Sequence, residues 1–383
     1  MKIAIFTDTF LPKIDGIVTA TLSLAMGLAN NGHKVCIIAP EYNNFKEFKY
    51  KNIKVTRMNS IPALFYPEFK ITNPFSIRVY MQLKKEKIDL VHFQTPLTIG
   101  MQGIIIAKLL KVPLIGTFHT LIADPKYLKH VKINGAIAQG ISWAYARAYY
   151  NQCDLITCPS ESVKNELLEH TFIKPIKVIS NGIDFSLFDN SNWKKVKEKY
   201  NPNGKTLLFI GRIAHEKSIP YLLDCFKLVL KKLPKTKLIL VGDGPQFKEI
   251  KNYIRFLKIE NSAILTGKIE HENLIKSGIF KAADLFVTAS TTETQGITML
   301  EAQVNGLVSI GMDAGGTKEL IKNNYNGYLV KKGKKEFADK IVKLLKDSSL
   351  IQKMQRNTLK EIKKHNMKKV IEIWEKEYQS LIK

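Results

Sequence analysis

The stretch "MKIAIFTDTFLPKIDGIVTATLSLAMGLANNGHKVCIIAP" (residues 1–40) has the pattern of one strand, one helix and a second strand. A short apolar run at 2–6 precedes a polar loop, and residues 17–31 place apolar side chains at helical spacing. Gly32 is a typical helix end, and 34–40 is again largely apolar. Apolar strands joined by helices are typical of a parallel sheet covered on both faces, so the stretch predicts an α/β fold.

The same alternation continues along the chain. Strand-like runs occur at 89–94, 113–118 and 155–160 and, after a break, at 206–212, 237–245, 263–269, 284–290 and 306–311. The break, 177–205, is rich in Asn, Gly and Lys, and we interpret it as an interdomain linker. We therefore expect two doubly wound Rossmann-like domains, at 1–190 and 191–365. A C-terminal helix at 366–383 follows, with Trp374 and Tyr378 on one face, and packing of this helix on the first domain is one option.

The composition is that of a globular protein with an unusual charge. The chain has 383 residues, of which 45% are hydrophobic and 24% charged. Its net charge of +25 predicts an anionic partner, which could be nucleic acid, a lipid surface or a phosphate-bearing substrate. The four cysteines form no CxxC pair, and we interpret them as buried thiols in a reducing cytoplasm. No apolar run is long enough to span a bilayer.

Two other classes of protein share some of these features. A nucleic-acid-binding protein would share the charge, but the sequence has no helix-turn-helix, zinc or aromatic RNA-binding signature, so no nucleic-acid partner is expected. A dinucleotide-dependent oxidoreductase would share the architecture. Its GxGxxG fingerprint should follow the first strand, yet the first glycine after that strand is Gly16.

The loop after the first strand of the second domain carries two cations. In "LLFIGRIAHEKSIPYLLDCF" (207–226), Arg212 and Lys217 precede a helix in which Pro220 suits the first turn. Arginine and lysine bind phosphate, and the start of a helix also favours anions. Two solvated loop cations would give the same pattern, so this motif alone leaves both interpretations open.

A second motif, "TETQGITMLEA" (292–302), follows the strand at 284–290. If a helix begins near Gly296, its free amides and the bare glycine backbone can approach a ligand. Glu293 then lies in the loop and Glu301 inside the helix, where carboxylates can accept hydrogen bonds from the hydroxyls of a sugar or a ribose. One capping and one surface glutamate is the alternative. Together with Arg212 and Lys217, the motif favours a nucleotide-sugar.

At this point the chain resembles a family, the retaining nucleotide-sugar glycosyltransferases of the GT-B fold. The resemblance covers nearly the whole chain and rests on Glu, seven residues, Glu in "ETQGITMLE" with "GRIAHEK", "VGDGP", "LTGKI" and "GGTKELI". The amino-terminal stretch and "TETQG" look most like bacterial diacylglycerol glycosyltransferases. Two departures, the absence of a proline in "GLVSIG" and the pair Thr317 and Lys318 in "GGTKELI", concern the loop expected beside the sugar.

The resemblance implies a role for each matching residue. Arg212 and Lys217 would hold the donor diphosphate, Glu301 the ribose, and Glu293 the sugar. His119, in "FHT" after a strand of the first domain, would lie by the anomeric carbon, although backbone hydrogen bonding is the ordinary role of such a histidine. The other residues expected to contact the nucleotide-sugar are Gly16, Gly267, Lys268, Ile269, Gln295, Gly296 and Ile297. Of this set, His119, Arg212, Lys217 and Glu293 would be catalytic.

The resemblance also implies the reaction: transfer of glucose or galactose from a UDP-sugar to diacylglycerol, with retention, at the inner face of the cytoplasmic membrane. Another lipid, a phospholipid headgroup or a cell-surface glycan remains an alternative acceptor. No Asp-x-Asp or metal-ligand cluster occurs in the sequence, so no metal or cofactor is expected. Two basic segments with apolar residues, 59–89 and 124–135, are candidates for membrane contact, although an ordinary helix packed on the sheet would explain the first equally well.

Overall fold

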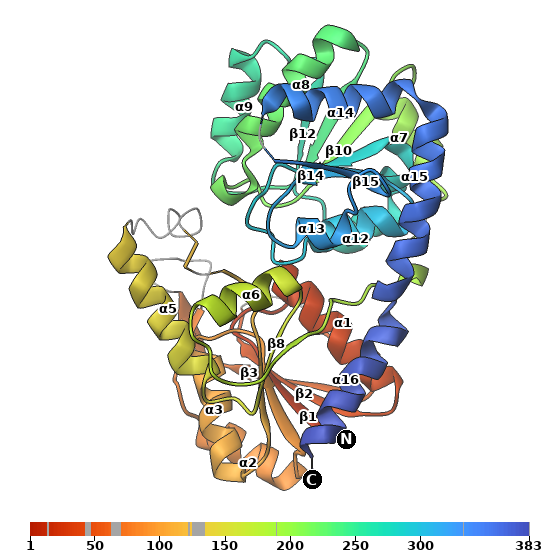
Figure 1. Cartoon of the computed structure of the whole chain (residues 1–383). Coiled ribbons are helices and arrows are strands. Elements are labelled where there is room, and N and C mark those ends of the chain that lie inside the picture. The colour runs from red at the N-terminus through yellow and green to blue at the C-terminus, as the bar shows by residue number, and fades with distance from the viewer. Residues whose placement is uncertain are drawn as a thin grey trace. The chain divides into compact units, whose positions relative to one another are not determined.

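The computed structural model describes residues 1–13, 15–42, 47–62, 70–121, 123–124, 135–188, 190–331 and 333–382. The chain forms two compact units (Figure 1). Unit 1 comprises Met1–Gly182 together with Met367–Lys383, and unit 2 comprises Ile183–Asn366. The chain therefore leaves unit 1 once, completes unit 2, and returns.

The described part of unit 1 is built on a parallel sheet of order β3-β2-β1-β6-β7-β8-β9. Its strands are β1 (Lys2–Phe6), β2 (Lys34–Pro40), β3 (Ile53–Met58), β6 (Leu90–Phe93), β7 (Leu114–Thr117), β8 (Leu155–Cys158) and β9 (Ile176–Val178). A short antiparallel ribbon pairs β4 (Ser60–Pro62) with β5 (Lys70–Thr72). The helices are α1 (Gly16–Asn30), α2 (Ile77–Glu86), α3 (Thr98–Leu110), α5 (Ala136–Tyr150), α6 (Glu161–Glu169) and α16 (Met367–Leu381).

The first forty residues form the strand, helix and strand predicted for them, β1, α1 and β2. The carboxylate of Asp15 accepts a hydrogen bond from the Val18 amide at 2.9 Å and so caps α1. Gly32 adopts a φ of +85°, a left-handed conformation that suits glycine, directly after the helix. Within β1, Ile3 and Ile5 face one core and Ala4 and Phe6 face the other, as the period of a strand requires.

The returning helix α16 covers one face of the unit 1 sheet. Its buried side chains, Val370, Ile371, Trp374 and Tyr378, share a core with the inward residues of α1 and β1. At Gly27 of α1 a Cβ atom would lie 2.5 Å from Ile371, so the missing side chain lets α1 and α16 pack closely. Trp374 and Tyr378 do share one face, as their spacing predicts.

Unit 2 has a second parallel sheet, of order β12-β11-β10-β13-β14-β15 in its described part. The strands are β10 (Thr206–Ile210), β11 (Lys237–Val241), β12 (Ala263–Gly267), β13 (Leu285–Val287), β14 (Val308–Met312) and β15 (Gly327–Val330). The helices are α7 (Trp193–Tyr200), α8 (Ile219–Lys232), α9 (Phe247–Phe256), α10 (His271–Lys276), α11 (Ile279–Ala282), α12 (Ile297–Val304), α13 (Thr317–Leu320), α14 (Lys334–Lys346) and α15 (Ser348–Glu361).

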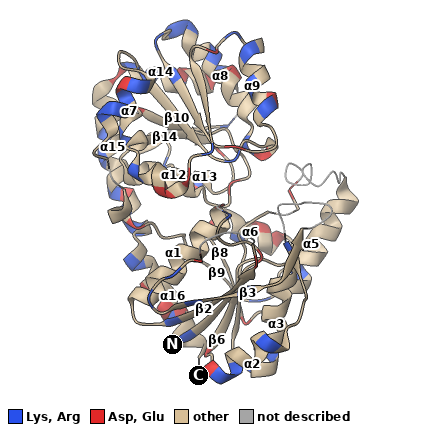
Figure 2. Ribbon diagram, turned by 180° about the vertical axis from the view of Figure 1, so that it is seen from behind, with Lys and Arg blue, Asp and Glu red and all other residues tan. Residues whose placement is uncertain are grey.

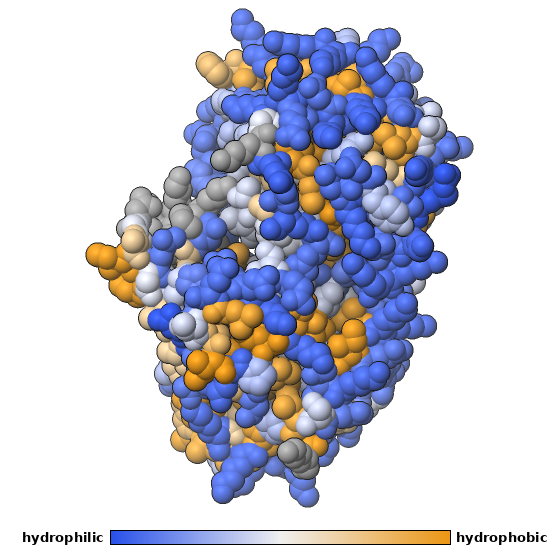
Figure 3. Space-filling view, viewed as in Figure 1, coloured by the Kyte–Doolittle hydropathy of each residue, from blue (hydrophilic) through white to orange (hydrophobic). Residues whose placement is uncertain are grey.

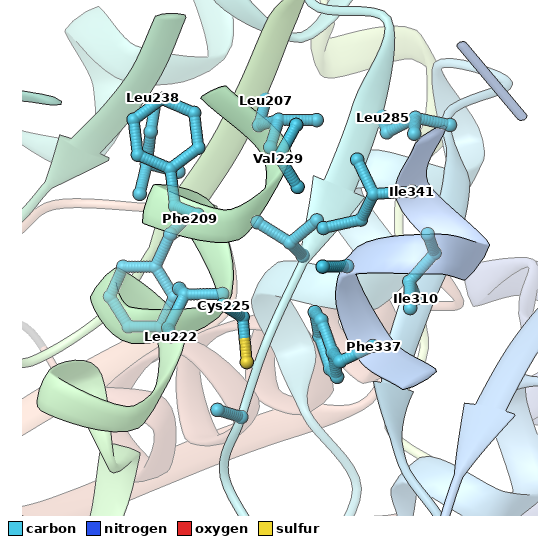
Figure 4. Packing of buried hydrophobic residues seen from close by; sticks show 14 of the residues in the cluster. Leu207, Phe209, Leu222, Cys225, Val229, Leu238, Leu285, Ile310, Phe337 and Ile341 are labelled. Carbon is cyan, nitrogen blue, oxygen red and sulfur yellow. The ribbon is translucent and has the colours of Figure 1, made fainter. Parts of the chain in front are cut away.

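The larger core of unit 2 lies between this sheet and helices α8 and α14. Figure 4 shows Leu222 and Val229 of α8 and Phe337 and Ile341 of α14 gathered around strand residues such as Leu207. Such interdigitated apolar packing is the main source of stability in a domain of this size. The four cysteines of the chain are free and buried, as predicted.

Both sheets confirm the predicted fold class of two doubly wound Rossmann-like domains. In each, the first strand lies in the middle of the sheet and the strand order reverses beside it, between β1 and β6 and between β10 and β13. In open parallel sheets, ligands bind beyond the carboxyl ends of the strands at such a reversal. Lys and Arg lie on helices of both units, for example on α2 of unit 1 and on α8, α9 and α14 of unit 2 (Figure 2).

Candidate functional site

The loop that carries Arg212 is held by glycines of the neighbouring strand end. Gly211 donates to the Val241 carbonyl at 3.0 Å, and Ile213 to the Asp243 carbonyl at 2.9 Å. A Cβ atom on Gly242 would lie 1.9 Å from the Gly211 oxygen, which leaves no room for any other residue there. The glycines of "VGDGP" thus fix the backbone on either side of the half-buried Arg212.

Lys217 and Glu293 form an ion pair at the same strand ends. Lys217 closes a 3₁₀ turn before α8, and its Nζ lies 2.6 Å from Glu293 Oε1. Burial lowers the pKa of Lys217, but the charge and hydrogen bond of Glu293 outweigh it and raise that pKa. Burial raises the pKa of Glu293, yet Lys217 brings it below its ordinary value. Both groups are therefore charged at neutral pH, and the positive charge of Arg212 also acts on Lys217.

The loop around Glu293 packs on the backbone of the "GGTKELI" segment. The Gly316 amide donates to the Glu293 carbonyl at 2.7 Å, and a Cβ atom on Gly316 would lie 2.3 Å from the Thr294 carbonyl. Gly315 has a φ of +51° and would clash with the Glu293 carbonyl at 2.6 Å. The two glycines therefore hold this loop in place. Thr317 and Lys318, where the sequence departs from the family pattern, lie outside that contact.

Helix α12 begins where the sequence predicts. Gly296, with a φ of +84°, is its N-cap residue, and Ile297 is its first residue. The Gln295 side chain before them is buried. The amides of these residues occupy the first turn, where a helix has no internal acceptors for its N–H groups.

Glu301 lies inside α12 with its side chain only 3% exposed. One carboxylate oxygen, Oε1, is 2.6 Å from Nε2 of His271, whose pKa is raised by its hydrogen bond to Glu301 against the effect of burial. The other oxygen, Oε2, is buried without a hydrogen-bond partner in the described part of the chain. An unsatisfied buried carboxylate oxygen is energetically unfavourable, so Oε2 is suited to accept a hydrogen bond from a ligand hydroxyl.

The predicted base-binding segment follows β12. Gly267 has a φ of +80°, and its carbonyl accepts from the Gly242 amide at 3.0 Å, which ties it to the Arg212 loop. Lys268 is exposed and pairs with Glu270 at 2.7 Å, while Ile269 packs partly on the core beneath α12. Unit 2 therefore brings the predicted cations, both glutamates and these loops together at one end of its sheet.

The two predicted residues of unit 1 also lie beyond strand ends. Gly16 is the exposed first residue of α1, and His119 follows β7. Burial lowers the pKa of His119 to about 4, and the charge of Asp15, the residue before Gly16, opposes this effect. His119 Nε2 lies 2.7 Å from the amide oxygen of Gln94. His119 is therefore neutral at pH 7 and close enough to the start of α1 for Asp15 to act on it.

Sequence reasoning missed three side chains of these sites: His271, Gln94 and Asp15. A signal was present for Gln94, because His92 and Gln94 are polar residues two apart in the strand-like run at 89–94 and so point to the same side. No comparable signal marks His271, which stands 30 residues from Glu301 in the sequence.

Of the two segments expected to contact a membrane, the structure describes the first in part. In α2, Val79 and Leu83 are buried, whereas Ile77 is 70% and Met81 56% exposed. The helix is thus packed on the sheet by one face and exposes both apolar and basic side chains on the other. Most of the second segment, 125–134, lies outside the described residues.

Further exposed apolar side chains lie at the beginning of α5, where Ile137 is 82% and Ile141 64% exposed. Figure 3 shows an orange area at this end of α5, next to the grey residues. Among the residues that the structure describes, no helix has both the length and the hydropathy that a membrane crossing requires. The same residues contain no group of three or more His, Cys, Asp or Glu suited to a metal ion.

Two Rossmann-like units in one chain, the second with paired cations and glutamates at its strand ends, define a glycosyltransferase of the GT-B fold. The chain belongs to this family: residues 14–187 match Glycosyltransferase Family 4, and residues 190–361 match Glycosyl transferases group 1. It is 32% identical to an alpha-monoglucosyldiacylglycerol synthase of Streptococcus pneumoniae, over 80% of this chain and 70% of that protein.

Other relatives differ in the activity their names describe. A GDP-mannose-dependent alpha-mannosyltransferase of Corynebacterium glutamicum is 28% identical over 86% of this chain and 76% of that protein. Among solved structures, Anabaena HepE in complex with UDP-glucose superposes with a TM-score of 0.78 at 20% identity, covering all of both chains. At that identity the superposition establishes the shared fold.

Proposed function

We propose that the protein transfers a hexose, glucose or galactose, from a UDP-sugar to 1,2-diacylglycerol with retained anomeric configuration. The observation that carries this proposal is the 32% identity, over 80% of the chain, to the synthase of S. pneumoniae. An alpha-monoglucosyldiacylglycerol synthase of Acholeplasma laidlawii, 28% identical over 79% of the chain, supports the same reaction. The mannosyltransferase relatives favour a second candidate, a GDP-mannose donor with another acceptor such as a phospholipid headgroup or a glycan.

In the proposed reaction, Arg212 and Lys217 stabilise the charge that grows on the departing diphosphate. Preorganised charges stabilise such a transition state strongly, because they do not have to reorient during the reaction. The glycine contacts around Arg212 and the Glu293 partner of Lys217 supply that preorganisation. The amides at the start of α12 add donors for the same phosphates. On this proposal no metal ion is required, so EDTA should leave activity unchanged.

Glu293 and Glu301 hold the two ends of the donor. Glu293 is kept ionised by Lys217 and accepts hydrogen bonds from the sugar. Glu301 Oε2 accepts one from the ribose, while His271 holds Oε1. His119 supplies a neutral imidazole beside the anomeric carbon, and the amide segment from Gly267 to Ile269 contacts the base. For retention we favour a same-face route in which the departing phosphate takes the acceptor proton.

We propose further that the protein acts as a peripheral enzyme on the inner face of the cytoplasmic membrane. The net charge of +25 favours anionic lipids, each surface cation adding about 1 kcal/mol. The exposed Ile77 and Met81 lie on a helix that also carries Arg78, Lys84 and Lys85. An exposed apolar face flanked by cations is suited to the interfacial region of such a membrane.

The test is to incubate the purified protein with UDP-glucose, UDP-galactose or GDP-mannose and mixed micelles that contain diacylglycerol. Anionic lipid is present or omitted, and lipid-extractable product is measured. A monohexosyl-diacylglycerol formed from one UDP-sugar supports the proposal and identifies the donor. Product from GDP-mannose alone would replace it with the second candidate, and release of nucleotide without glycolipid would retain the donor and reject the acceptor.

A further inference from the structure

The Glu301 carboxylate of α12 is bonded by a residue of a different helix, His271 of α10. Nε2 of His271 lies 2.6 Å from Oε1 of Glu301, whose side chain is only 3% exposed. Within the described ranges of the chain, each of these two side chains has the other as its one hydrogen-bond partner. An ionised carboxylate only accepts, so Nε2 of His271 carries a hydrogen and donates it to Oε1.

The packing of the two helices holds the two side chains together. His271 is the first residue of α10, and Leu274 and Ile275 of that helix are buried. Leu274 belongs to the same hydrophobic cluster as Met299 and Leu300 of α12. The bond is therefore part of the fold of unit 2 and joins two segments that are distant in the sequence.

The charges around His271 leave Glu301 as the carboxylate that it serves. The acidic residues on either side of His271 already have lysine partners at 2.7 Å, Glu270 with Lys268 and Glu272 with Lys276. The hydrogen bond to Glu301 raises the pKa of His271 against the opposing effect of burial. A buried carboxylate without a partner is costly in free energy, so the bond from His271 lowers the cost of holding Glu301 inside α12.

We propose that His271 is a positioning residue, which fixes the rotation of the Glu301 carboxylate and leaves Oε2 as the acceptor for the ribose of the donor nucleotide. Oε2 has no hydrogen-bond partner among the described residues, whereas Oε1 is occupied. Without the bond the carboxylate can turn about its last C–C bond, because the torsional preference there is broad. This inference rests on the proposed function for the assignment of Glu301 to the ribose, but not for the base, the sugar or the acceptor.

A purely structural role of His271 predicts a different outcome. His271 stands two residues after Ile269, the end of the segment expected to contact the base, so loss of its ring would also disturb that segment. A double-mutant cycle separates the two roles. If His271 acts through Glu301, replacing it has no effect on nucleotide binding once Glu301 is absent. If it shapes the segment, the effect is the same in both backgrounds.

The experiment measures UDP binding by calorimetry for the wild type, His271→Phe, Glu301→Ala and the double variant. Phenylalanine keeps a ring and removes the donor, at a position whose side chain is 31% exposed. We expect His271→Phe to weaken UDP binding about 3- to 10-fold, the equivalent of one ordinary hydrogen bond. In the Glu301→Ala background the same change should have no further effect. With the UDP-sugar as substrate, the donor KM should rise by a similar factor and kcat should stay nearly unchanged, because the ribose is not at the reacting centre.

A conservative variant tests the donor itself. In His271→Gln the side-chain amide can donate to the same oxygen of Glu301, so most of the lost affinity should return. The matched control is Lys276→Ala, which breaks an exposed ion pair on the same helix and should bind UDP as the wild type does.

Wild-type UDP affinity in His271→Phe would overturn the proposal, and so would an equal loss in both Glu301 backgrounds. If His271→Phe does not fold, the double variant is compared with Glu301→Ala, and a further loss of affinity there overturns the proposal in the same way. If the wild type binds UDP but transfers no hexose to diacylglycerol, the proposed function fails, and the cycle still decides the role of His271. If it binds GDP in place of UDP, the proposed donor is wrong, and the cycle is run with GDP, which carries the same ribose.

Discussion

The unpartnered oxygen of Glu301 makes a quantitative prediction for Glu301→Gln. Oε1 of Glu301 is bonded to His271, so on the proposed function Oε2 is the oxygen that binds the ribose. Glutamine has a single acceptor oxygen, and this cannot serve both His271 and the nucleotide equally well. A hydrogen bond to a charged acceptor contributes about 1.5–3 kcal/mol. At about 1.4 kcal/mol for each factor of ten, UDP affinity should fall about 10- to 150-fold.

Analogues of the ligand make the assay specific for the ribose contact. Binding of UDP and of its 2′-deoxy and 3′-deoxy analogues is measured by calorimetry for the wild type and for Glu301→Gln. The wild type should bind one of the analogues more weakly than UDP by a factor similar to the effect of the mutation. In the mutant that difference should nearly disappear, because the partner of the hydroxyl is already lost.

The matched control is Glu272→Gln, on the same helix as His271 but exposed and paired with Lys276. It should bind all three nucleotides as the wild type does. The reasoning is refuted if Glu301→Gln binds UDP normally, or if both deoxy analogues lose the same factor in wild type and mutant.

Three further predictions concern charge. Lys217→Ala should lower kcat/KM at least about 100-fold with the fold retained. The control Lys232→Ala, on the exposed side of α8, should keep the wild-type kcat/KM. Similar activity in the two variants would contradict the role of Lys217 in holding the diphosphate. Burial holds the pKa values of His92 and His365 near 3 and 4, below the unfolded value of about 6.5. The unfolded chain therefore binds more protons between pH 6.5 and about 4, and each histidine should lower the free energy of unfolding by about 1.4 kcal/mol for each pH unit of acidification in that range. Urea unfolding at pH 7, 6 and 5 measures this, and a constant stability would count against it. Finally, binding to anionic vesicles should weaken as salt rises from 0.1 to 1 M, since the screening length falls from about 10 to 3 Å; binding that ignores salt would exclude an electrostatic attachment.

The central strands could be predicted from sequence because they are buried on both faces and read as apolar runs. Strand β3 was not predicted, and its composition explains why. It is an edge strand in which Lys54 and Arg57, three residues apart, point to opposite faces, so neither a continuous apolar run nor a clean alternation marks it. Strand β9 is only three residues long, which is too short for any periodicity.

The residues of the candidate site likewise fall into those that could be predicted from sequence and those that could not. Residues in the loops that follow the strands, such as Arg212 after β10 and Glu293 after β13, could be predicted because parallel strands bring their carboxyl ends to one edge. Partners that meet only through packing could not. His92 and Tyr378 are 286 residues apart, and the sequence pattern of α16 predicts which face of it is buried without predicting what that face meets.

The return of the chain to unit 1 has a consequence for protein synthesis. Gly182 and Met367 are in contact, with a Cβ on Gly182 placed 3.1 Å from the Met367 Cα, so unit 2 is an insertion between two touching positions. During translation the insertion is complete and free to fold before its host. Until Tyr378 leaves the ribosome, the face of unit 1 around Ile3 and Leu24 lacks its cover. That apolar surface stays exposed until the end of synthesis, and it is where we expect a chaperone to bind the nascent chain.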